Sequence, residues 1–176
     1  MKKVWLLLVL IILAGIAAGC KTSPNEGIPT APKQGAYAPE FTLTNTVGEK
    51  VTLSSHRGKV VLINFWATWC PPCMREMPDI NSRYEMYSEN FVVLAVDNGD
   101  PVQQVVQFRD QVGLAFEPLL DSRGAVSQLY QVTAFPTSMF VDEHGIIQFV
   151  HIGLMTVAQL DDYLADMGLG TEISSN

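Results

Sequence analysis

The segment Val60-Val61-Leu62-Ile63-Asn64-Phe65-Trp66-Ala67-Thr68-Trp69-Cys70-Pro71-Pro72-Cys73 decides the fold of this chain. Its first half, residues 60–66, is an apolar run broken only by Asn64, which is typical of a strand buried on both faces. Helical spacing begins directly after the second cysteine. A Cys-x-x-Cys at such a junction places its first sulfur beside the unpaired N–H groups and the positive dipole end of the helix. Because this setting lowers a thiol pKa, the segment predicts thiol–disulfide exchange.

Two other uses of the Cys70/Cys73 pair are less well supported. A Cys-x-x-Cys bridge closes too small a loop to restrict the unfolded chain much, so a structural disulfide is disfavoured. A zinc site needs about four ligands, and the three histidines of the chain have no paired spacing. We therefore expect no metal and no cofactor.

The N-terminus resembles a targeting segment. Lys2-Lys3 precedes an uncharged run of 15 residues, and Cys20 follows two alanines and a glycine. Because a membrane span takes roughly 20 apolar residues, residues 1–19 are interpreted as a lipoprotein-type signal peptide, with cleavage before Cys20 and a lipid on its sulfur. Ala17 stands where that motif favours Leu, so an uncleaved signal anchor is the alternative. Either one places the domain outside the cytoplasm, tethered to the membrane, where disulfides matter.

The charge balance is acidic. The chain has 11 Lys+Arg and 18 Asp+Glu, a formal charge of −7, and two of the lysines belong to the expected signal peptide. The acidic residues are scattered, which favours a solvated surface over a binding patch. No basic patch suggests a nucleic-acid partner.

The remaining chain divides into a tether, one domain and a tail. Residues 20–36 are rich in Pro, Gly, Ser and Thr and predict a flexible membrane tether. Residues 37–169 form the expected domain, and residues 170–176 the tail. The expected elements are a hairpin (41–43 and 51–53), strand 60–66, helix 72–87, strand 91–96, helix 101–112 with Asp100 as its N-cap, strand 119–120, helix 123–130, strands 137–141 and 146–152, and helix 157–167 capped by Thr156. This alternation predicts an α/β fold with a central mixed sheet flanked by helices.

Two short segments carry a family resemblance. The stretch from Phe65 to Cys73 resembles the active-site segment of thioredoxin-fold proteins, and Ala134-Phe135-Pro136-Thr137 is similar to their cis-proline loop. The N-terminal hairpin, an extra strand–helix unit near residues 100–120 and the export signal resemble the membrane-anchored, extracytoplasmic thiol-disulfide oxidoreductases of the ResA/TlpA type, with an AhpC/TSA-redoxin-like domain. The resemblance covers about residues 37–169.

The resemblance implies an activity and its partners. It implies reduction of disulfides in exported proteins, including apocytochrome c before haem attachment, with electrons from a membrane thiol reductase. A disulfide-donating oxidase with the same residues remains open, because direction depends on redox potential. A tethered thiol-based metal chaperone is a second alternative. A peroxidase is disfavoured, since peroxiredoxin-like sites place Thr or Ser three residues before the reactive cysteine, where this chain has Ala67.

The resemblance also assigns roles around the motif. Cys70 is expected as the partly exposed attacking thiolate and Cys73 as the more buried resolving thiol. Because two prolines separate them, the N–H groups of Cys73 and Met74 are the expected donors to the Cys70 sulfur. Glu76 matches a glutamate of the ResA-type branch and is the expected proton carrier, with a solvated helix residue as the alternative. Asn64 stands where thioredoxins carry a buried Asp.

The expected substrate-binding residues are Trp69, Phe135 and Pro136. Trp69 is expected on the exposed rim of the site. The resemblance implies a cis bond before Pro136, against the alternative of a trans proline that starts a strand. It further implies that the Phe135 backbone lies beside Cys70, where an extended substrate could pair with it.

Overall fold

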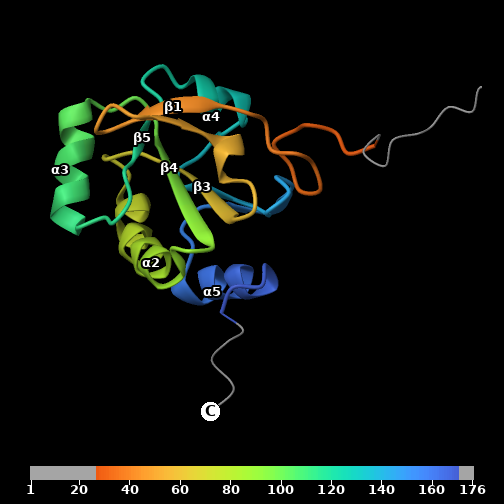
Figure 1. Ribbon diagram of the computed structural model, residues 1–176. Helices are drawn as coiled ribbons and strands as arrows, with labels where there is room; N and C mark the ends of the chain where they lie inside the picture. Colours follow the sequence, from red (N-terminus) through yellow and green to blue (C-terminus); the bar gives the residue numbers. More distant parts are fainter. Residues whose placement is uncertain (1–26, 171–176) are drawn as a thin grey trace, which may run out of the picture.

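The computed structural model describes residues 27–170 of this 176-residue chain (Figure 1). The expected signal peptide, the anchor residue Cys20, most of the expected tether and residues 171–176 lie outside the described residues. In the part that is described, no helix has both the length and the apolar character that a membrane crossing requires.

Within residues 27–170, seven strands and four α-helices follow one another in the order that the sequence predicts, apart from one short additional 3-10 turn. They are β1 (Thr42–Asn45), β2 (Lys50–Thr52), the 3-10 turn η1 (Leu53–His56), β3 (Val60–Trp66), α2 (Pro71–Tyr87), β4 (Phe91–Asp97), α3 (Val102–Val112), β5 (Leu119–Leu120), α4 (Ala125–Leu129), β6 (Thr137–Val141), β7 (Ile147–Ile152) and α5 (Val157–Asp166).

The strands form one mixed sheet in the order β2-β1-β5-β4-β3-β6-β7. Strand β3 runs parallel to β4 and antiparallel to β6, and β4 runs parallel to β5. Both predicted hairpins, β1–β2 and β6–β7, are present as antiparallel pairs. The carboxyl ends of β3 and β4 therefore lie beside the start of β6, at the same end of the sheet. The Cys-x-x-Cys segment follows directly after β3 at this end.

Helices cover the sheet on both faces. Leu62 and Trp66 of β3 pack in a cluster with residues of α2, α3 and α5, whereas Val61, Ile63 and Phe65 pack in a second cluster with α4 and the N-terminal segment. In Figure 1, α4 accordingly lies on the side of the sheet opposite α2 and α5. Every residue of β3 is buried, which explains its nearly continuous apolar sequence.

The start of α5 agrees with the prediction, whereas the starts of α3 and α4 differ from it. Thr156 caps α5 in a capping box with Gln159, as predicted. The prediction of Asp100 as the cap of α3 is wrong: Pro101 is the N-cap residue, because the Asp100 carboxylate accepts a hydrogen bond from the Thr68 backbone instead. Helix α4 is shorter than the expected 123–130, since Gly124 precedes it in the left-handed region at φ 66°.

The folded part begins before Tyr37. The Gly35 N–H donates to the Ile147 carbonyl at 2.8 Å, and the Ile147 N–H donates to the Ala36 carbonyl at 2.9 Å. Ala36 is fully buried. The tether expected to extend to residue 36 is therefore too long at its C-terminal end, because hydrogen bonds to β7 fix its last residues.

Candidate active site

Cys70 and Cys73 form a disulfide at the start of α2. Cys70 is the N-cap residue, and its sulfur accepts a hydrogen bond from the Cys73 N–H at 3.3 Å. The Met74 N–H donates to the Cys70 carbonyl at 3.1 Å. Of the two donors expected for the Cys70 sulfur, only Cys73 reaches it, because Met74 makes the first hydrogen bond of the helix.

The two cysteines differ in exposure less than expected. Cys70 is 3% exposed and Cys73 is fully buried. Their predicted order is right, but the prediction that Cys70 is partly exposed is wrong for this oxidised form. The Cys70 sulfur is bonded to Cys73 and also accepts its N–H, so it is held against the helix start.

Aromatic side chains form a rim beside the disulfide. Trp69 is 64% exposed, as predicted, and its ring contacts that of Phe135 edge-on, with centroids 5.9 Å apart. The Phe135–Pro136 peptide bond is cis, as the resemblance implied. The Gly153 N–H donates to the Pro136 carbonyl at 2.8 Å, which ties this loop to the end of β7.

Glu76 lies in the protein interior beneath the helix start. It is 1% exposed, so the alternative of a solvated helix residue is wrong. Asn64 Nδ2 donates to Oε1 at 2.8 Å, and the Met155 N–H donates to Oε2 at 2.9 Å. Burial raises the pKa of Glu76 to about 7, although both hydrogen bonds act to lower it.

Asn64 joins Glu76 to the cis-proline segment. Its Nδ2 also donates to the Ser138 hydroxyl at 3.0 Å, two residues after Pro136. The sequence analysis assigned the proton to Glu76 and gave Asn64 no role in the chemistry, whereas the structure makes the two residues hydrogen-bond partners. Glu76 follows Cys73 by one helical turn and therefore lies on the same face of α2. A carboxyl that titrates near neutral pH beside a dithiol can accept and return a proton.

Sequence reasoning missed Asp97, the last residue of β4. Asp97 is fully buried and pairs in register with Trp66 of β3. Burial raises its pKa to about 8, and the neighbouring Asp100 adds to the shift. A predicted strand that ended at residue 96 left Asp97 in a loop. An acid at the end of an otherwise apolar run was the signal that could have identified it.

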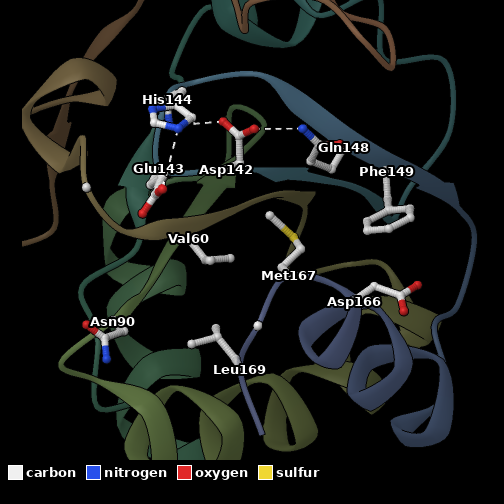
Figure 2. Close-up of a pocket in the computed structure, with 12 residues that line it drawn as sticks. Val60, Asn90, Asp142, Glu143, His144, Gln148, Phe149, Asp166, Met167 and Leu169 are labelled. Carbon is white, nitrogen blue, oxygen red and sulfur yellow. Dashed lines mark hydrogen bonds and ion pairs between the residues drawn. The ribbon is translucent and has the colours of Figure 1, made fainter. Parts of the chain in front are cut away.

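A separate cavity lies at the other end of the sheet (Figure 2). It has a volume of about 420 Å³ and is lined by the start of β3, the β6–β7 turn and the segment after α5. None of the expected site residues lines it. His144 at its edge lies 3.4 Å from Glu143, and His151 contacts the Tyr163 hydroxyl at 3.2 Å, so neither joins the disulfide site.

The described residues offer no metal site: between residues 27 and 170 no three His, Cys, Asp or Glu side chains are grouped so that they could hold an ion. The chemistry that this arrangement can perform is a two-electron exchange between the Cys70/Cys73 pair and another disulfide or dithiol.

Comparison with known proteins agrees with this chemistry. Residues 34–150 match the AhpC/TSA family. The chain is 39% identical over 136 residues to the thiol-disulfide oxidoreductase ResA of Geobacillus kaustophilus (strain HTA426), which covers 77% of this chain and 78% of the relative. It is 36% identical over 168 residues to the thioredoxin-like protein YneN of Bacillus subtilis (strain 168), which covers 93% of this chain and 98% of the relative.

A solved structure shows the same architecture. The crystal structure of a Chlorobium tepidum protein assigned as the thiol:disulfide interchange protein DsbE aligns with a TM-score of 0.69 at 31% identity. The alignment covers 74% of this chain and 94% of that protein. The fold is therefore thioredoxin-like, with the β1–β2 hairpin and the α3–β5 unit as additions that the sequence predicted.

Proposed function

Because the chain belongs to the AhpC/TSA family and is a thiol-disulfide oxidoreductase, we propose that it reduces disulfide bonds in proteins exported from the cytoplasm, apocytochrome c among them. The observation that carries the proposal is the Cys70–Cys73 pair at the start of α2, one turn from a buried carboxyl with a pKa near neutral. A dithiol in that setting can release a thiolate and dispose of its proton at physiological pH.

The reaction takes two exchanges. In the reduced protein the Cys70 thiolate attacks one sulfur of the substrate disulfide, which forms a mixed disulfide and releases one substrate thiolate. The Cys73 thiolate then attacks the Cys70 sulfur, which re-forms the Cys70–Cys73 bond and releases the second substrate thiolate. The substrate gains two electrons and two protons, and the protein loses them.

Glu76 carries a proton in the second exchange. Cys73 is fully buried, so its thiol cannot lose a proton directly to water. Glu76 lies on the same helical face and is held by the Asn64 amide and the Met155 N–H. It takes the proton of Cys73 as that sulfur attacks Cys70 and passes it on to a departing substrate thiolate.

The substrate is bound by three residues beside the disulfide: Trp69, Phe135 and Pro136. The exposed Trp69 ring rests edge-on against Phe135, so the two rings present apolar surface next to the disulfide. An extended peptide that lies along the loop before β6 places its cystine within reach of Cys70. The exposed apolar ring of Trp69 suits unfolded or partly folded chains, which present apolar side chains of their own.

The domain works outside the cytoplasm, tethered by a lipid on Cys20. The uncharged run before Ala-Ala-Gly-Cys supports this proposal. A membrane thiol reductase then returns two electrons to the Cys70–Cys73 disulfide after each turnover. Metabolic labelling with a fatty acid should mark the wild-type chain and not the Cys20→Ala variant. Absence of label on the wild type would end the lipid proposal.

Trapping tests the substrate proposal. In Cys73→Ser, the mixed disulfide on Cys70 cannot be resolved, so the variant should accumulate covalent adducts with exported, cysteine-containing proteins. The matched control, with both cysteines replaced by Ser, should trap none. An adduct set that lacks apocytochrome c in cells that make cytochrome c would remove that substrate from the proposal.

The redox potential tests the direction. A Cys70–Cys73 potential more negative than about −200 mV fits a reductase, by comparison with known exchangers. A potential as oxidising as about −120 mV would instead assign a disulfide-donating oxidase. Tight copper binding by the reduced pair, with no disulfide reduction, would support a metal chaperone.

A further inference from the structure

Two carboxyl groups meet at the carboxyl end of β4, behind the active-site loop. Asp97 is fully buried, and its Oδ2 accepts the backbone N–H of Asp100 at 3.0 Å. The two carboxyl groups also lie close enough for a proton on one of them to be shared with the other, which helps to raise the pKa of Asp97. Asp97 Oδ1 has no further partner among the described residues. Two carboxyl groups can share a hydrogen bond only when one of them carries a proton.

The second carboxyl of this pair holds the active-site loop. Asp100 Oδ2 accepts the Thr68 N–H at 2.6 Å. Thr68 lies inside a turn that the Cys70 N–H closes by donating to the Ala67 carbonyl at 3.2 Å. The position of Asp100 therefore bears on where Cys70 stands at the start of α2.

The surroundings of Asp97 keep a proton on this pair. Asp100 and Asp121 are the charged groups that act on it, and both are acids. On β3 its neighbour is the uncharged Trp66, which packs with the cysteines of α2 and with Phe108 of α3. Further titratable groups on that side are Glu76, which is engaged with Asn64, the two thiols when they are reduced, and the phenols of Tyr84, Tyr87 and Tyr163.

We propose that Asp97 is a positioning residue, whose carboxyl shares one proton with Asp100 and thereby keeps Asp100 on the Thr68 N–H and Cys70 at its N-cap position. The raised pKa of Asp97, about 8, sets the range in which this arrangement fails. Above it, two adjacent negative charges repel each other, Asp100 withdraws from Thr68, and the loop loses its anchor. This inference concerns the thiol chemistry itself and is independent of which substrate is reduced.

The oxidised protein gives the direct test, because it contains no titrating thiol at the site. The Thr68 backbone amide should show a chemical-shift step with a midpoint near pH 8 in ¹⁵N-edited NMR spectra. In Asp97→Asn that step should be absent. The amide that replaces the carboxyl can donate a hydrogen bond to Asp100 at every pH, as the protonated Asp97 carboxyl does below about pH 8. Two controls should keep it: Glu76→Gln, which removes a second buried carboxyl, and Asp162→Asn on the exposed side of α5.

The reduced protein gives the functional test. The exchange rate, corrected for the fraction of Cys70 thiolate, should fall roughly tenfold between pH 7 and 9.5 in the wild type, the equivalent of one hydrogen bond to a charged group. In Asp97→Asn the corrected rate should fall less steeply over that range, because only the decline that follows the ionisation of Glu76 is left. Asp97→Ala should be slow at every pH, and thermal unfolding of its oxidised form should check that it is folded.

Two results would overturn the proposal. One is a wild-type Thr68 amide with no step between pH 7 and 9, or a step that persists in Asp97→Asn. The other is a corrected rate that declines equally with pH in the wild type and in Asp97→Asn. A residue with a merely structural role would lower the rate at all pH values and leave the shape of the profile unchanged.

Discussion

The carboxyl groups at the two ends of the sheet differ in their burial and in the number of hydrogen bonds that they accept. At the active-site end, Glu76 and Asp97 are buried, and no described Arg or Lys forms an ion pair with either. At the other end, Asp142 in the β6–β7 turn accepts three hydrogen bonds, from the His144 and Ile146 N–H groups and from Gln148 Nε2. Figure 2 shows those from His144 and Gln148. A half-buried acid with three donors organises a turn, whereas a buried acid with few donors holds a proton near neutral pH. The disulfide lies at the end of the sheet where the buried acids have few donors, whereas the cavity of about 420 Å³ lies at the other end.

The largest expected contrast is in activity. Cys70→Ser should lower the rate of disulfide reduction on the order of 10³-fold or more, because the attacking sulfur is lost. Asp142→Asn, at the opposite end of the sheet, should leave the rate within about twofold. Reduction of a disulfide-bonded test protein by the dithiol measures both. Substantial activity in Cys70→Ser, or its loss in Asp142→Asn, would break the comparison.

The second contrast is in stability against pH. The pKa of Glu76 is about 7 in the folded protein, against an ordinary value of 4.5. Its contribution to stability is therefore complete below about pH 4.5 and is lost as the pH rises to 7. Glu76→Gln cannot ionise, so between pH 4.5 and 8 it should gain about 3 kcal/mol in unfolding free energy relative to the wild type.

Urea unfolding of the oxidised proteins at both pH values measures this gain. The disulfide removes thiol titration from the comparison, and Asp97 is present in both proteins, so its effect cancels. Parallel stability curves for wild type and Glu76→Gln would mean that Glu76 is ionised at low pH despite its burial.

A smaller contrast lies between the two thiols. Cys70 accepts the Cys73 N–H at the helix start, so its pKa should lie below the free value of about 8.5, and that of Cys73 above it. Glu76→Gln should lower the thiol pKa values by about one unit, since it removes a nearby negative charge. The rate of alkylation against pH measures both, and the shift belongs to the coupled group. Curves that overlay in the two proteins would separate Glu76 from the thiols.

The smallest expected effect concerns the rim. Trp69→Ala removes an exposed ring that contacts Phe135, so it should raise KM for a protein substrate about three- to tenfold and leave the reduction of a small disulfide unchanged. The exposed Val47→Ala in the β1–β2 turn is the matched control and should change neither. Equal losses with both kinds of substrate would assign Trp69 to the chemistry rather than to binding.

Sequence patterns correctly predicted the structural features that depend only on residues close together in the chain. The limits of β3, the start of α2 within one residue and the Thr156 cap of α5 follow from an apolar run, a motif and a capping pattern. The exposed position of Trp69 and the cis bond at Pro136 came from the family resemblance.

Contacts between distant segments were not accessible in the same way. Glu76 is held by Met155, 79 residues away, and Asp100 by Thr68, 32 residues away. No pattern in α2 indicates that other strands and loops will cover the Glu76 carboxyl, so its burial was left open. Asp97 did have a local signal, an acid at the end of an apolar run, but the predicted strand ended one residue before it.

The hydrogen bonds between residues 35–36 and Ile147 have a consequence for handling the protein. Strand β7 is the last strand of the sheet, and an uncovered edge strand can pair with another copy and start aggregation. Residues 35 and 36 form hydrogen bonds with the beginning of β7, so the end of the tether also blocks that part of the edge from pairing with another copy. A shortened chain that starts at Ala38 would expose the beginning of that edge, while one that starts at Gly27 would keep these hydrogen bonds and should remain soluble at higher concentration.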